Sequence, residues 1–184
     1  MELKKEFVDI AYKILTRREN NAFTDMDLYV ISSIQRLIKL HEGFETLIEK
    51  QNYEAAIPLL RLMLDTCMRL IAVGLSSAPQ EVINAFFSDK NISKIKSIEG
   101  KPLSDGYLKD KLETIQPGVK AMYNELSSYI HLSGTHFTSL ITKEKKLCIG
   151  GNNLFENKML VTAIDLKHQE ILQLANKLLV AYLL

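Results

Sequence analysis

Apolar residues recur at intervals of three and four over most of this chain, which is the spacing of amphipathic α-helices. Thr24 and Asn52 suit the positions just before two of these helices, because their side-chain oxygens accept hydrogen bonds from free backbone amides. The pattern therefore predicts an all-α fold, a helical bundle of five to seven helices forming one domain over residues 1–184. The predicted helices cover residues 3–18, 24–50, 53–75, 79–88, 108–115, 117–131 and 156–182.

The predicted helix over 53–75 is the most apolar part of the chain, with the sequence AAIPLLRLMLDTCMRLIAVGL over most of its length. A helix that is apolar on almost every side is usually central in a bundle. The predicted last helix instead has one apolar face. We expect this face to point into the bundle; its residues are Leu160, Ile164, Ile171, Leu174, Leu178 and Leu179.

Two segments depart from the helical pattern. Residues 89–105 are rich in lysine, serine, glycine and proline, so we predict a mobile loop there. Residues 137–142 and 147–149 are short β-prone runs on either side of a charged tip. A small β-hairpin near 137–149 is therefore a further expectation.

Composition narrows the class of protein. Apolar residues make up 47% of the 184 residues and charged residues 24%, which is typical of a globular chain. A formal net charge of +1 argues against a nucleic-acid binder that relies on a large, uniformly basic surface. Cys67 and Cys148 follow no metal-binding or redox spacing, so we expect two free thiols and a cytoplasmic location. No segment has the pattern of a signal peptide or a membrane span.

Three charged residues interrupt the central apolar helix. Arg61, Asp65 and Arg69 stand four apart, so they form one stripe along it. Three interpretations remain open: a solvated face, a buried ion network that fixes helix packing, and a site for an anion or phosphate. The last follows from the planar fork of hydrogen-bond donors that arginine presents.

A second polar cluster follows about sixty residues later. Tyr123, Ser127 and His131 share one stripe of a predicted helix, and His136 follows in the turn beyond it. Histidine is the usual acid or base at neutral pH, but a histidine at a helix end also commonly caps or packs. The chain has no G-x-S-x-G elbow and no phosphate-binding glycine loop. We expect no metal site and no cofactor.

The two clusters together resemble those of a family of uncharacterised bacterial helical proteins. The carrying motifs are LLR-x3-D, ending at Asp65, and Y-x2-LS-x3-H-x-S, which starts at Tyr123 and includes His131. These proteins are similar in character to the HEPN-type helical bundles, many of which are dimeric, metal-independent ribonucleases of toxin–antitoxin or phage-defence systems. The resemblance covers residues 52–136. It implies an arginine beside a phosphate and a histidine that moves protons.

The arginine–histidine motif of the HEPN-type ribonucleases has one literal match here, Arg36 to His41. Five residues of regular helix turn the chain by about 140°, so these two side chains should diverge. Leu37 also stands where those proteins have a polar residue. We interpret the match as chance. A ribonuclease site would instead combine Arg61 or Arg69 with His131.

Two functions remain as hypotheses. The first is a bundle, expected to be a homodimer, that binds a small anionic ligand, a nucleotide or a partner protein. The polar cleft that it would use is built from Arg61, Asp65, Arg69, Tyr123, Ser127, His131 and His136. The alternative is a HEPN-like ribonuclease that binds RNA and uses His131, Arg61 and Arg69 in catalysis.

Overall fold

The chain is all-helical in the computed structural model, which describes residues 2–17, 22–131, 134, 136, 145–147 and 158–183. These residues form no β-strand, so the predicted all-α bundle is confirmed. The predicted hairpin near 137–149 lies almost entirely outside the described residues. The helices are α1 (Glu2–Thr16), α2 (Asp25–Glu49), α3 (Tyr53–Leu75), α4 (Pro79–Phe87), the 3-10 helix η1 (Ile92–Lys94), α5 (Asp105–Ile115), α6 (Val119–Ser127) and α8 (Lys158–Leu183).

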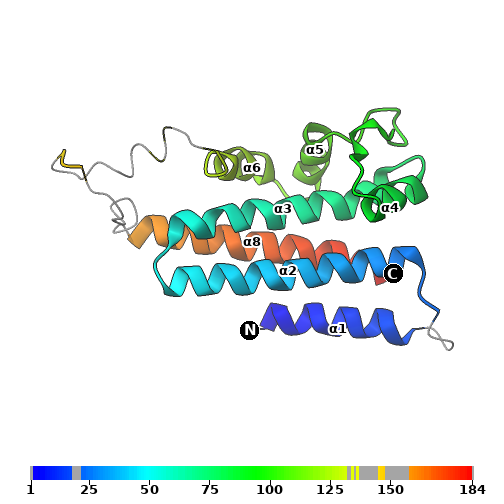
Figure 1. Cartoon of the computed structure of the whole chain (residues 1–184), viewed down its shortest axis with the longest axis horizontal. Coiled ribbons are helices and arrows are strands. Elements are labelled where there is room, and N and C mark those ends of the chain that lie inside the picture. Colours follow the sequence, from blue (N-terminus) through cyan, green and yellow to red (C-terminus); the bar gives the residue numbers. More distant parts are fainter. Residues whose placement is uncertain are drawn as a thin grey trace.

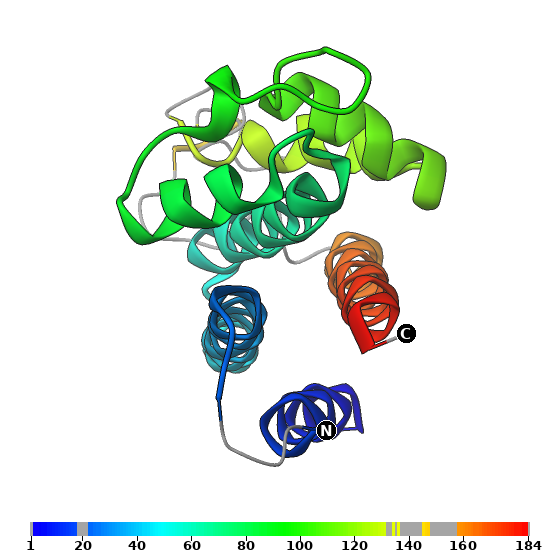
Figure 2. The same cartoon turned by 90° about the vertical axis from the view of Figure 1, so that its right-hand side faces the viewer.

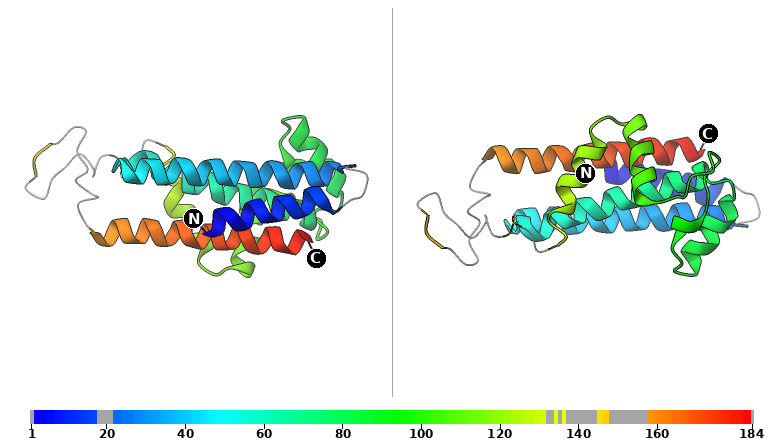
Figure 3. Two further views of the ribbon diagram at one scale, coloured as in Figure 1. Left: turned by 90° about the horizontal axis from the view of Figure 1, so that it is seen from below. Right: turned by 90° about the horizontal axis from the view of Figure 1, so that it is seen from above.

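Four long helices form the bundle: α1, α2, α3 and α8. They lie side by side along one axis, and α8 runs in the same direction as α3 (Figure 1). Seen from the end of that axis, they stand at four corners around a shared interior (Figure 2). The shorter helices α4, α5 and α6 cover the side of α3 that faces away from α1, as the views from below and above also show (Figure 3). As its apolar sequence predicts, α3 is therefore enclosed on most sides.

The starts of α2 and α3 follow from their capping residues. Thr24 precedes α2, and its hydroxyl accepts a hydrogen bond from the Asp27 amide at 3.1 Å, while the Asp27 carboxylate accepts one from the Thr24 amide at 2.8 Å. This reciprocal arrangement satisfies two backbone donors that would otherwise have no helical partner. Asn52 caps α3 through a single bond, in which its side-chain oxygen accepts from the Ala55 amide at 3.4 Å. Both capping predictions are confirmed.

The interior is apolar and continuous. Its largest fully buried side chains come mainly from α1, α2 and α3, with Leu103, Leu108 and Leu112 contributed from the α5 region. On α8, the inward face predicted from spacing is observed at Ile164, Ile171, Leu174 and Leu179, all of them buried. Burial of these side chains is the main stabilising contribution to such a bundle.

The segment before α5 differs from its prediction. Residues 89–104 are attached to the end of α3 rather than forming a loose loop: an isolated β-bridge joins Ser76 to Ser97, and the Ile98 amide donates to the Leu75 carbonyl at 2.9 Å. Ile92 and Leu103 are buried beneath the segment. Single apolar anchors in a polar sequence have no periodicity, so helix and strand patterns do not reveal them.

Helix α6 is shorter than predicted. It begins after Gly118, whose φ of 95° lies in the left-handed region that favours glycine, and ends at Ser127, where turns follow. The sequence pattern predicts a helix that extends to His131. That residue lies beyond the helix end, so the stripe expected to include Tyr123, Ser127 and His131 is interrupted.

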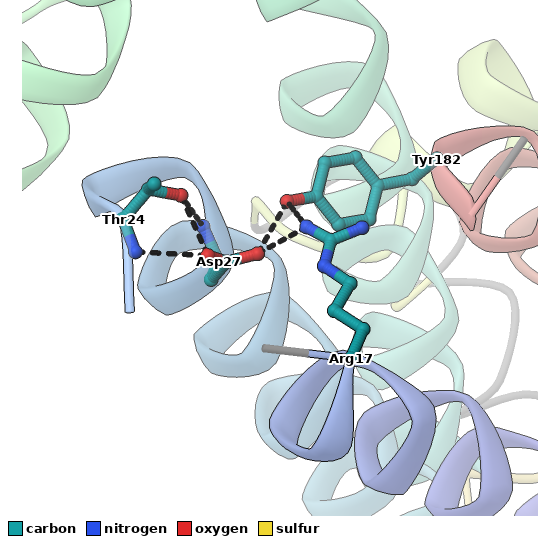
Figure 4. A network of polar contacts seen from close by, with 4 residues as sticks. All are labelled: Arg17, Thr24, Asp27 and Tyr182. Carbon is teal, nitrogen blue, oxygen red and sulfur yellow. Dashed lines mark hydrogen bonds and ion pairs between the residues drawn. The ribbon is translucent and has the colours of Figure 1, made fainter. Parts of the chain in front are cut away.

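One buried carboxylate joins three helices at an end of the bundle. Asp27 is buried and accepts hydrogen bonds from Thr24, from the Tyr182 hydroxyl at 2.8 Å and from Arg17 (Figure 4). Burial alone would raise the pKa of Asp27, but the bonds from Thr24, Tyr182 and Arg17 outweigh it and hold the pKa well below its usual value. The C-terminal ends of α1 and α8 are thereby fixed to the start of α2.

Candidate functional site

Arg61 lies at the centre of a closed polar cluster between α3 and α6. Its side chain is buried, with the residue only 8% exposed, and its Nε donates to the Ser127 hydroxyl at 3.0 Å. Its guanidinium carbon lies 3.6 Å from the centre of the Tyr123 ring, and it forms an ion pair with Asp65 one turn along α3. We call these four residues the Arg61 cluster. Four of the seven residues predicted for the cleft are thus brought together.

The Arg61 cluster is held together largely by contacts among its own members, and the buried Nη1 of Arg61 meets the Asp65 carboxylate as an ion pair. The Ser127 hydroxyl donates to the Tyr123 carbonyl at 2.7 Å, and Lys109 covers the Tyr123 ring at 4.7 Å. Burial raises the pKa of Tyr123 despite the opposing charge of Arg61, so the phenol stays neutral at physiological pH. Because cation–π contacts and hydrogen bonds already engage the guanidinium, the cluster fixes α6 on α3 and presents little of Arg61 to a ligand.

Arg69, the third charged residue of the stripe, is placed differently. Its side chain is 39% exposed and donates to the Asp105 carboxylate at the start of α5, at 2.8 Å. Its backbone carbonyl accepts from the Tyr29 hydroxyl at 2.8 Å, and burial raises the pKa of Tyr29 to about 12. Arg69 therefore lies on the surface beside α2 and α5, outside the Arg61 cluster.

The contacts described for Arg61 include neither of the two predicted histidines. His131 is exposed and follows the end of α6, and the described contacts of Arg61 run to Asp65, Ser127 and Tyr123 rather than to it. His136 is partly exposed, and its ring meets Tyr129 edge-on at a centroid distance of 6.3 Å. No described contact joins either histidine to an arginine.

An open pocket lies instead between α2, α3 and α4. Its volume is about 520 Å³. Arg36 enters from α2 and is exposed, and its Nε donates to the Thr66 hydroxyl at 3.2 Å. Arg69 and Asp65 enter from α3. We call this the Arg36 pocket; it is lined by Tyr29, Ser32, Ser33, Arg36, Asp65, Thr66, Arg69 and Phe86.

The hydrogen-bond donors of the Arg36 pocket can be identified from the existing bonds. Thr66 donates to the Leu62 carbonyl at 2.9 Å, and Ser33 to the Tyr29 carbonyl at 2.9 Å, so both hydroxyl protons are used within their helices. The terminal nitrogens of Arg36 have no hydrogen-bond partner in the part of the chain that the structure describes. Arg36, Arg69 and the exposed Ser32 are therefore the groups that could donate to a ligand.

A second pocket, of about 590 Å³, adjoins the first and shares Tyr29, Arg69 and Phe86 with it. Phe86 is 43% exposed and packs edge-on against Tyr29, with ring centroids 4.9 Å apart. We call this second space the Lys90 pocket. Its remaining lining residues are Val82, Ala85, Asp89, Lys90, Asn91, Ile92, Ser93, Ser104 and Asp105.

The two residues of the literal arginine–histidine match lie on different faces of α2, as the helical angle predicts. Arg36 borders the open pocket, whereas His41 is buried at 5% exposure and its Nδ1 lies 3.0 Å from Nε2 of His168 on α8. Burial lowers the pKa of His41, and burial together with the neighbouring imidazole lowers that of His168 to about 4. His41 thus contributes to helix packing and does not face the pocket that Arg36 borders.

Sequence reasoning missed most of the open site. The sequence pattern indicates Asp65 and Arg69, but it offers Arg36 only as part of a chance motif, and it does not distinguish Tyr29, Ser32 and Phe86. The available signal was a basic residue on α2 flanked by small hydroxyl residues, which is too common on exposed helix faces to be specific. Cys67 is buried, and burial raises its pKa to about 12, so it offers no reactive thiol.

Within the described ranges, no group of three histidine, cysteine or acidic side chains is placed to hold a metal ion. None of the helices in those ranges is both long and apolar enough to cross a bilayer. No protein-family model, no curated protein and no solved structure matches this chain. The site must therefore be interpreted from its own geometry.

Proposed function

We propose that this protein binds a small anionic ligand, of the size of a nucleotide, in the Arg36 pocket. The observation that carries the proposal is the pair of arginines from two helices, Arg36 and Arg69, on one open pocket. Guanidinium groups bind phosphate and carboxylate through paired, charge-assisted hydrogen bonds. Ser32 adds a third donor from α2, and Phe86 and Tyr29 supply an aromatic wall.

The charge around the Arg36 pocket also favours an anion. Among the described residues, Asp65 supplies the one carboxylate that lines it, and the buried Arg61 forms an ion pair with that carboxylate. Arg36 has no acidic partner among the described residues. A ligand anion would therefore meet an excess of positive charge in a partly enclosed space, where electrostatic attraction is stronger than in bulk water.

The test is direct binding of inorganic phosphate and adenosine monophosphate by calorimetry at two salt concentrations. We expect both to bind, with adenosine monophosphate tighter because its base can contact Phe86. Arg36→Ala and Arg69→Ala should each weaken binding about tenfold, the effect of losing a charged hydrogen bond. Arg36→Lys keeps the charge but loses the fork, so it should restore only part of the affinity.

Lys39→Ala is the matched control. Lys39 is an exposed cation one turn along α2, paired with Glu42 at 2.9 Å. Its removal lowers the net charge by the same amount as Arg36→Ala without altering the pocket, so binding should be unchanged. Equal losses in the Lys39 and Arg36 variants would mean diffuse attraction to a basic surface and would contradict the proposal.

The ribonuclease alternative is distinguished in the same experiments. Incubation with a single-stranded RNA, followed by gel analysis, should show no cleavage if the protein only binds its ligand. Cleavage that His131→Ala abolishes would instead support an enzyme in which the exposed His131 reaches the substrate's phosphate.

A further inference from the structure

The two adjoining pockets differ in charge. The Arg36 pocket has two lining arginines and one carboxylate, and Arg61 already pairs with that carboxylate. The Lys90 pocket has two lining cations, Arg69 and Lys90, and two carboxylates, Asp89 and Asp105. One compartment therefore attracts anions, and the other is balanced.

Asp105 is the carboxylate that produces this asymmetry at the junction of the two pockets. It borders the Lys90 pocket only, and it bonds at 2.8 Å to Arg69, which borders both. The Arg69 guanidinium is thereby partly neutralised on one side and open on the other. A second anionic group placed in the Lys90 pocket would be repelled by Asp105 and Asp89. It would also have to compete with these carboxylates for the same cations.

The polar lining of the Lys90 pocket indicates what it would accept. Asn91, Ser93 and Ser104 border it together with the two carboxylates. Carboxylates accept hydrogen bonds and cannot donate when ionised, so they suit hydroxyl or amino groups of a ligand. Phe86 stands between the compartments as a shared apolar surface.

We infer that the cleft selects a ligand with one anionic head and a neutral or cationic, hydroxyl- or amine-bearing end, and that Asp105 is the residue that sets this selection. The inference rests on the proposed function, because the anionic head occupies the Arg36 pocket. It adds to that function the class of ligand and the residue that excludes molecules negatively charged at both ends.

The test compares fructose 6-phosphate with fructose 1,6-bisphosphate, two probes that differ only in a second phosphate at the far end. Affinities are measured by calorimetry for the wild-type protein and two variants. The wild type should bind the monophosphate tighter than the bisphosphate by about fivefold, the factor expected for one exposed charge. Asp105→Asn should bring the ratio to about one or reverse it.

Asp110→Asn is the matched control. Asp110 lies on the same helix, α5, is also exposed and pairs with Lys120 at 2.8 Å, but it borders neither pocket. It should leave the ratio at the wild-type value. Circular dichroism checks that both variants remain folded, and both keep a side chain of the original size.

The outcomes separate the two proposals. Failure of both sugar phosphates, inorganic phosphate and adenosine monophosphate to bind overturns the proposed function and this inference with it. Binding that depends on Arg36, but with equal affinity for both sugar phosphates or a ratio that Asp105→Asn does not change, overturns the inference alone. An equal change of ratio in the Asp110 variant also overturns it, because the effect would then be one of net charge.

Discussion

The Arg61 cluster and the Arg36 pocket lie on neighbouring faces of α3. Both contain arginines, but the arginines have different roles in the two places. In the cluster, one arginine is buried against a tyrosine ring, a serine hydroxyl and a carboxylate. In the pocket, Arg36 is exposed, Arg69 is partly exposed, and both border an open space. Burial therefore distinguishes a group that holds helices together from one that can hold a ligand.

The difference follows from what covers each part of α3. Helix α6 packs over the turn that holds Arg61 and supplies Tyr123 and Ser127 to it. Two turns later, the Arg69 side chain bonds to Asp105 at the start of α5, and space remains between α2, α3 and α4. Asp65 belongs to both regions, since it pairs with Arg61 and borders the pocket.

The largest predicted effect is on the Arg61 cluster. Arg61→Ala should lower the free energy of unfolding by about 3 kcal/mol, because it removes buried packing and leaves Asp65 and Ser127 without their partner. Urea denaturation measures the change. Arg61→Met combined with Asp65→Asn should recover part of the loss, since no unpaired ion is then left. A loss below about 0.5 kcal/mol for Arg61→Ala would place Arg61 with the exposed arginines instead.

The buried histidine pair should make the free energy of unfolding decrease as the pH is lowered. His168 has a pKa of about 4 in the folded protein against 6.5 ordinarily, so the unfolded chain binds protons first as the pH falls. The stability contributed by the neutral ring is complete above about pH 6.5 and is lost towards pH 4. We expect a loss of about 2 kcal/mol between pH 7 and 5.

The environment of the pair limits this effect. Burial lowers the pKa of His41 as well; Glu45, whose carboxylate lies 3.5 Å from His41, opposes the shift, and Lys4 reinforces it. Urea denaturation at a series of pH values provides the measurement. Replacing both histidines with leucine should remove most of the slope between pH 7 and 5, where few carboxylates titrate. A slope unchanged by that replacement would assign the pH dependence to other groups.

The smallest predicted effect on stability is that of Arg36→Ala. Arg36 is exposed and makes one described hydrogen bond, to Thr66, so its loss should change the free energy of unfolding by less than about 0.5 kcal/mol. Thermal denaturation without ligand tests this. Combined with weakened phosphate binding, such a result would show that Arg36 serves ligand binding and not helix packing. A decrease of several kcal/mol in the free energy of unfolding would contradict this.

Much of the fold could be predicted from sequence, because its determinants are local. The caps at Thr24 and Asn52 and the apolar run of α3 are properties of short segments, and each places an element correctly. Residues 89–104 could not be predicted in this way. Their attachment depends on Ile92, Leu103 and a bridge to Ser76, which are contacts with distant parts of the chain.

The candidate site was less predictable for the same reason. The stripe of Arg61, Asp65 and Arg69 was visible in the sequence, and one of its three interpretations, a buried ion network, describes Arg61 and not Arg69. Nothing in the stripe itself indicates where α6 ends and open space begins. Arg36 becomes a candidate binding residue only because it borders, together with Arg69, a pocket formed by three helices.

The contacts of Asp27 have a consequence for the order of events during synthesis. They join residues 17, 24 and 27 to residue 182, so one end of the bundle is closed by groups from opposite ends of the sequence. While the chain is on the ribosome, α1, α2 and α3 exist before α8 emerges, and their inward apolar faces lack that neighbour. The nascent chain that still lacks α8 should therefore expose apolar surface until the last helix emerges, and such surface is what chaperones bind.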